Sequence, residues 1–104
     1  MNNEDFAKLM EKQEALEKEI MRVKGNDYTL ESPDRHFNFK LVAQLVGITP
    51  EQALMVYWLK HVLSLCNHAK GGRESEPIEQ RIADVRNYPM LYRGLVEEKV
   101  QVRQ

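Results

Sequence analysis

Hydrophobic residues after Thr49 recur every three or four positions up to Ala69, which is the spacing of an α-helix. Thr49 suits the N-cap, Pro50 suits the first turn, and Gln52 stands where the partner in a capping box belongs. The apolar residues cover more than half of the circumference of this predicted helix. They are Leu54, Met55, Trp58, Leu59, Val62, Leu63, Leu65, Cys66 and Ala69. We therefore expect this helix to have neighbours on several sides.

Two shorter helical patterns lie before this segment. Between residues 3 and 24 the apolar positions form a narrow heptad stripe, and Gly25 is the predicted end of that helix. A second helix is predicted over residues 33–46, because a proline opens it and Gly47 follows its last apolar residue.

The last helix is predicted to begin near Ser75 or Glu76 and to kink or restart at Pro89. Proline removes a helical hydrogen bond and collides with the preceding turn. The amphipathic pattern then fades, so we expect residues 97–104 to fray. The sequence predicts an all-α fold: a four-helix bundle that forms a single domain over residues 1–104.

A chain of 104 residues buries only a modest core, so association with a second copy would supply missing contacts. The heptad stripe of residues 3–24 offers a pairing surface, and we expect a homodimer. The net charge is −1, with 30% charged residues spread along the chain. This balance lacks the basic surface of a nucleic-acid binder, so nucleic acid is not an expected partner.

The single cysteine, Cys66, cannot form an intrachain disulfide. It lies on the apolar arc, where we expect it to be buried, and this favours a reducing compartment. The apolar run at residues 53–66 is short and interrupted by Lys60 and His61, and the acidic opening does not resemble a signal peptide. We expect a soluble cytoplasmic protein without a membrane partner.

A row of polar residues on the last helix is the first candidate for chemistry. Glu76, Gln80, Asp84 and Asn87 share one stripe, which becomes apolar at Leu91. Asp84 should therefore lie near the edge of the core, where a carboxylate must be paired, hydrogen-bonded or bound to a metal ion.

Two interpretations of Asp84 remain open. The first is a salt bridge to Arg81, Arg86 or Lys60. The second is a Mg²⁺ site in which Glu76 and Asp84 supply the hard oxygen ligands and a phosphate completes the shell.

The histidines do not form a predicted zinc site. His61 and His68 are seven residues apart, which places their side chains roughly 10 Å apart on a helix, and Cys66 points to another side. We therefore interpret His36, His61 and His68 as ordinary histidines.

Short strings in the chain resemble the phage-associated nucleotide-modification domains of the broad MazG-like group of all-α nucleotide pyrophosphohydrolases. These strings are Lys24-Gly25-Asn26-Asp27-Tyr28, Phe37-Asn38-Phe39 and Gly47-Ile48-Thr49-Pro50-Glu51, followed by the single residues Lys60, Glu76, Asp84 and Tyr88.

The resemblance implies a dimeric helical bundle that binds a nucleoside triphosphate with Mg²⁺. By matching position, Glu76 and Asp84 would bind the metal, Lys60 would contact phosphate, and Asp27 and Tyr28 would lie at the mouth of the nucleotide pocket. Gln80 stands where the family pattern has a second carboxylate. The chain is therefore expected to be either a Mg²⁺-dependent pyrophosphohydrolase or a degenerate protein that only binds nucleotide.

Two other classes of function remain. The heptad stripe would also suit a non-catalytic interaction protein that forms a helical dimer. The string LVAQLVGITPEQAL at residues 41–54 has the rhythm of a helix-turn-helix DNA binder, although its second helix is long and apolar for a DNA groove.

Overall fold

The computed structural model describes residues 1–27 and 32–103, and that part of the chain contains four helices and no strand. The helices are α1 (Asn3–Asp27), α2 (Phe37–Val46), α3 (Pro50–Ala69) and α4 (Ile78–Arg103). The prediction of an all-α four-helix bundle is confirmed. None of the helices in the described residues is long and apolar enough to cross a membrane.

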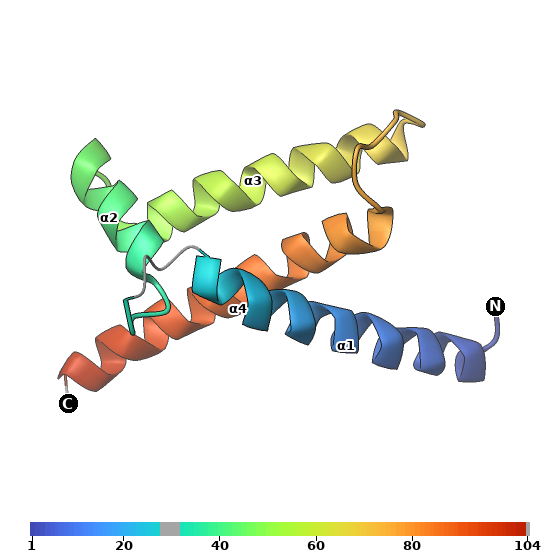
Figure 1. Cartoon of the computed structure of the whole chain (residues 1–104), viewed down its shortest axis with the longest axis horizontal. Helices are drawn as coiled ribbons and strands as arrows, with labels where there is room; N and C mark the ends of the chain where they lie inside the picture. The colour runs from blue at the N-terminus through green and yellow to red at the C-terminus, as the bar shows by residue number, and fades with distance from the viewer. Residues whose placement is uncertain (28–31, 104) are drawn as a thin grey trace.

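α4 packs against both α1 and α3 (Figure 1). α3 packs along α4 and runs in the opposite direction, α2 packs on α3, and α1 packs on α4. Within the described residues, α1 does not pack against α2 or α3. Its N-terminal half extends away from the other helices, and the molecule measures 46 × 30 × 24 Å (Figure 1).

The predicted helix signals around residue 49 are present. The Thr49 hydroxyl accepts a hydrogen bond from the Gln52 backbone N–H at 3.1 Å, and the Gln52 side chain accepts one from the Thr49 N–H at 3.0 Å. Gly47 ends α2 in the left-handed conformation with φ 84°, and its N–H donates to the Ala43 carbonyl. The capping box and the glycine stop together fix the turn from α2 into α3.

The predicted end of α1 at Gly25 is wrong, because the helix continues to Asp27. Gly25 has another role in the structure. A Cβ at this position would collide with the Arg35 guanidinium, so the glycine allows Arg35 to lie against the helix backbone.

α2 begins at Phe37 instead of Pro33, because side-chain hydrogen bonds hold the residues before it in a turn. The Ser32 hydroxyl accepts from the Asp34 N–H at 3.1 Å, and Asp34 Oδ1 accepts from the His36 N–H at 3.0 Å. Such local side-chain bonds compete with helix formation.

α4 begins at Ile78, slightly later than predicted, and passes through Pro89 as one continuous helix. The helix does not restart at Pro89, and the kink there stays a prediction. α4 continues to Arg103, and the fraying from residue 97 stays a prediction. Polar contacts hold this end: Lys99 Nζ lies 3.0 Å from a Glu51 carboxylate oxygen, and Glu98 pairs with α2.

The buried apolar core is small. It consists of Phe39, Ala43, Ala53, Leu54, Ala83 and Leu95. The prediction that Cys66 is buried is wrong, because its side chain is exposed. Much of the apolar arc of α3 is exposed with it, since α2 and α4 cover only one side of this helix.

Leu54, which is 1% exposed, is the anchor of this core. We expect Leu54→Ala to lower the free energy of unfolding by about 2–5 kcal/mol, because it leaves a cavity between α3 and its neighbours. The matched control is Leu45→Ala, at a leucine on α2 that is 76% exposed. The control should change stability by no more than about 0.5 kcal/mol. Urea denaturation followed by circular dichroism measures both, and equal losses would contradict this description of the core.

Candidate functional site

A pocket of about 120 Å³ is lined by the C-terminal part of α1 and by residues of the other three helices. Its apolar walls include Phe39 and Leu91. Six polar side chains also line it: Lys24, Arg35, Asn38, His61, Asp84 and Asn87. Apolar walls with a few convergent polar groups are the lining composition of small-molecule sites.

Asp84 is the central acidic group of this pocket. The residue is only 4% exposed, so the predicted inward position of Asp84 is confirmed. Its carboxylate lies 3.3 Å from Lys24 Nζ on α1 and 3.6 Å from His61 Nδ1 on α3. These contacts join three helices around one buried charge.

The predicted salt-bridge partners of Asp84 are wrong. Arg81 pairs with Glu74 and Glu76 at 3.5 and 3.6 Å, and Arg86 pairs with Glu17 at 3.0 Å. The reason is the rotation of α4, which directs Asp84 toward the pocket while the two arginines reach acids on other segments.

His61 lies beside Asp84 in an environment that favours its neutral form. Burial lowers the pKa of His61, the Asp84 carboxylate partly opposes this effect, and the nearby cation of Lys24 adds to it. The imidazole stacks on Tyr88 with the ring centroids 5.1 Å apart. At neutral pH His61 is therefore an uncharged hydrogen-bonding group on the pocket wall.

Arg35 and Lys24 bring positive charge to the same pocket. Arg35 precedes α2, and its Nη2 donates a hydrogen bond to the Met21 carbonyl. A guanidinium has five N–H donors, so this bond leaves capacity for a ligand. Gly25 allows this close approach of the arginine, and Lys24 is already balanced in part by Asp84.

Two carboxamides complete the polar lining. Asn87 donates from Nδ2 to the Glu17 carbonyl at 3.1 Å, which fixes the amide between α4 and α1. Asn38 contributes from the first turn of α2. Amides offer both donors and acceptors to a ligand.

The structure does not bring all of the predicted site residues together. Glu76 lies before α4, is exposed, and pairs with Arg81. Lys60 is exposed, and neither of these residues lines the pocket. The Asp27 side chain and Tyr28 lie outside the described residues. Of the predicted metal and phosphate ligands that the structure describes, only Asp84 belongs to the pocket.

The pocket residues do not fit the Mg²⁺ ion that the family resemblance implies. Asp84 is the only carboxylate among the described lining residues, and one of its oxygens already pairs with the Lys24 ammonium at 3.3 Å. Mg²⁺ requires hard oxygen ligands in octahedral geometry, and one carboxylate shared with a lysine is a weak donor set.

His61, Lys24 and Arg35 were not predicted from the sequence as members of one site. A signal existed for His61, because it lies on the polar wedge of the predicted central helix. No periodicity connects this wedge with residues of α1 or with the segment before α2. Their meeting depends on how the helices pack.

The lowered pKa of His61 makes stability depend on pH. The unfolded side chain binds a proton near pH ~6.5, whereas the folded one requires lower pH. The free energy of unfolding should therefore fall as the pH drops from above 6.5 toward the lower folded pKa. We expect denaturation at about pH 7.5 and 5.5 to show this loss, and His61→Gln to reduce it. The exposed control His68→Gln should keep it; an unchanged profile in His61→Gln would assign the loss to other groups.

Comparisons of the chain with family models, with curated proteins and with solved structures give no match. The contacts, burial and charges of the pocket are therefore the basis for a functional proposal.

Proposed function

We propose that the protein is a small MazG-like, phage-type nucleotide-handling protein that binds a nucleotide in the Asp84 pocket. The observation that carries the proposal is the convergence of Arg35 and Lys24 on a pocket with aromatic walls. A nucleotide presents the matching chemistry, since it joins an anionic phosphate to a flat base.

The charges of the pocket support an anionic ligand. Arg35 and Lys24 are cationic, Asp84 offsets one of these charges, and the pKa of His61 is lowered, which leaves a net positive site. Guanidinium groups bind phosphate oxygens through paired hydrogen bonds, so Arg35 is the proposed phosphate contact.

The remaining walls support an aromatic ring. Phe39 and Tyr88 meet edge to face with their centroids 6.1 Å apart, and both line the pocket. The amides of Asn38 and Asn87 supply donors and acceptors for the edge of a base.

The oxygen ligands available in the pocket favour nucleotide binding without Mg²⁺-dependent hydrolysis. One lysine-paired carboxylate is too little to hold a catalytic Mg²⁺ ion. We therefore place the chain with nucleotide binders that have lost the acidic site of the enzymes.

Nucleotide binding can be tested by thermal shift and calorimetry with a panel of ribonucleoside and deoxyribonucleoside triphosphates. At least one should raise the melting temperature equally with Mg²⁺ and with a chelator. Arg35→Met should weaken its affinity about tenfold or more, because a charge-assisted hydrogen bond is lost. Gly25→Ala should also weaken it by displacing the guanidinium.

The matched control is Arg93→Met, at an exposed arginine of α4 that pairs only with Glu97 among the described residues. This variant should bind like the unmodified chain. Absence of any stabilising nucleotide, or equal loss in Arg35→Met and Arg93→Met, would refute the assigned pocket. Release of pyrophosphate that requires both Mg²⁺ and Asp84 would instead restore the enzymatic alternative.

A second proposal, formation of a homodimer, rests on the first half of α1. Every residue from 1 to 12 is exposed, including Phe6, Leu9 and Met10. Isolated helices shorter than about 12–15 residues are only marginally stable in water. This exposed half of α1, called the arm below, therefore needs a surface to cover its apolar side. A second copy of the chain is the proposed cover.

The size of the exposed surface supports this proposal. The accessible surface is 7827 Å², whereas a monomer of 12.2 kDa exposes about 6,100 Å². The excess of about 1,700 Å² exceeds the ~800 Å² that each partner buries in a standard interface. The radius of gyration, 15.7 Å, is likewise above the ~13 Å typical of a domain of this length.

Light scattering after gel filtration should give twice the chain mass of 12.2 kDa. The double variant Phe6→Glu/Leu9→Glu should be monomeric, because it places charges on the apolar side of the arm. Glu11→Lys, on the opposite side of the same helix turns, should remain dimeric. A monomeric mass for the unmodified chain would contradict the dimer and leave the nucleotide proposal standing.

A further inference from the structure

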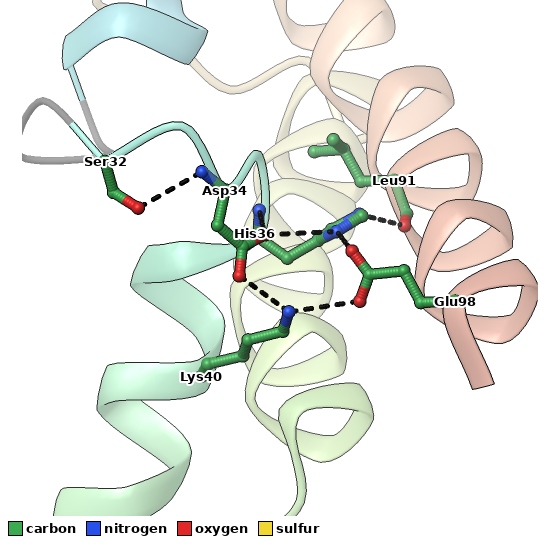
Figure 2. Close-up of polar contacts among 6 residues, drawn as sticks. All are labelled: Ser32, Asp34, His36, Lys40, Leu91 and Glu98. Atoms are coloured by element: carbon green, nitrogen blue, oxygen red, sulfur yellow. Dashed lines mark hydrogen bonds and ion pairs between the residues drawn. The ribbon is translucent and has the colours of Figure 1, made fainter. Parts of the chain in front are cut away.

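A second polar cluster lies between the start of α2 and the C-terminal part of α4 (Figure 2). Asp34 and His36 come from the turn before α2, Lys40 comes from α2, and Glu98 comes from α4. None of these four residues lines the Asp84 pocket. The cluster is therefore a separate site, and inferences about it are independent of the proposed nucleotide binding.

His36 is held rigidly in this cluster. Its side chain is 7% exposed, and its Nε2 lies 3.0 Å from the Leu91 carbonyl oxygen (Figure 2). Gly94 makes room for the ring, since a Cβ there would lie 2.9 Å from two imidazole atoms. A carbonyl oxygen can only accept a hydrogen bond, so Nε2 carries the proton in the neutral ring.

The other ring nitrogen faces negative oxygens, and its contact with Glu98 has the length of a hydrogen bond. His36 Nδ1 lies 2.9 Å from Glu98 Oε1 and 4.0 Å from Asp34 Oδ1. Carboxylate oxygens can only accept, so a positive species, either a proton on Nδ1 or a metal ion, must lie between Nδ1 and Glu98. This arrangement is the observation that points to a ligand.

Both carboxylates are ionised and oriented by the same lysine. Lys40 Nζ lies 2.6 Å from Asp34 Oδ2 and 3.1 Å from Glu98 Oε2, which leaves Oδ1 and Oε1 directed toward His36 (Figure 2). Burial opposes ionisation, but the contacts with Lys40 and His36 outweigh it and hold the pKa of both carboxyls below its usual value. Two carboxylates and one lysine give the cluster a net negative charge before His36 is counted.

We propose that Asp34, His36 and Glu98 bind a divalent transition-metal ion of the zinc type. The three ligand atoms lie within 4.8 Å of one another. In tetrahedral coordination at zinc–ligand distances of ~2.0–2.2 Å, neighbouring ligand atoms are about 3.3 Å apart. The observed separations of 2.9 and 4.0 Å lie on either side of this value.

The surroundings of the cluster match those of a metal-binding histidine. Such a histidine donates its second ring N–H to a carbonyl or carboxylate, as His36 does to Leu91. The mixed nitrogen and oxygen set favours Zn²⁺ or Co²⁺ over Mg²⁺. Asp34 and Glu98 are partly exposed, so water can complete the coordination. Arg35 lies between two of the ligands, so the metal would also fix the segment that carries the proposed phosphate contact.

The competing occupant of the same position is a proton, which would turn His36 into an imidazolium ion paired with Glu98. A metal titration distinguishes the two. Chain freed of metal with a chelator is titrated with Zn²⁺ and with Co²⁺ by calorimetry and absorption spectroscopy. We expect one ion per chain, Co²⁺ absorption without a thiolate charge-transfer band, and a rise in melting temperature.

His36→Gln and Glu98→Gln should each weaken binding at least about tenfold, because each removes a ligand. The control Cys66→Ser/His68→Gln removes the exposed thiol and imidazole of α3 and should bind like the unmodified chain. Far-UV circular dichroism of the metal-free variants checks that they are folded; if His36→Gln is not, Glu98→Gln decides. Failure to bind one ion, or equal binding in Glu98→Gln, overturns the proposal and assigns the position to a proton.

Discussion

The burial of the Asp84 carboxylate is the constraint on which the arrangement of α1, α3 and α4 depends. A lone buried charge is costly, and removing one partner of a buried pair destabilises a protein strongly. Here Lys24 on α1 supplies the compensating charge at 3.3 Å, and the uncharged imidazole of His61 on α3 lies 3.6 Å away. The apolar core is too small to define this meeting point alone. The pocket is thus located where the Asp84 charge is balanced by Lys24, and its net positive charge comes from Arg35.

The helices themselves were largely predictable, because their signals are local. Thr49 and Gln52 form the predicted capping box, and Gly47 ends α2 as predicted. The inward position of Asp84 was also predictable, since its row becomes apolar one turn later. The predicted helix ends were wrong where a residue from a distant segment contacts the position that carries the local signal. Gly25 was predicted to end α1, but its role in the structure is to leave room for the Arg35 guanidinium, which comes from another segment.

The candidate site was much less predictable than the helices. Periodicity identifies which side of a helix is apolar or polar, but it does not say which helix covers that side. For this reason Asp84 was assigned the wrong partners, and Cys66, on an apolar arc, is exposed in the structure. The polar cluster at His36 and Glu98 had no sequence signal, because it joins a turn to a segment expected to fray. In each case the missing information is the relative rotation of packed helices.

The position of α1 also has a consequence for the order of folding. α2, α3 and α4 pack on their neighbours in the chain, whereas α1 packs on α4, and the Lys24–Asp84 contact spans 60 residues. Closing a long loop lowers the conformational entropy of the chain before a stabilising contact has formed. Contacts between distant segments therefore form slowly. The α2–α3–α4 unit can therefore assemble first, with α1 docking afterwards. Until that last step the Asp84 carboxylate stays open to water, and the pocket beside it is not yet formed.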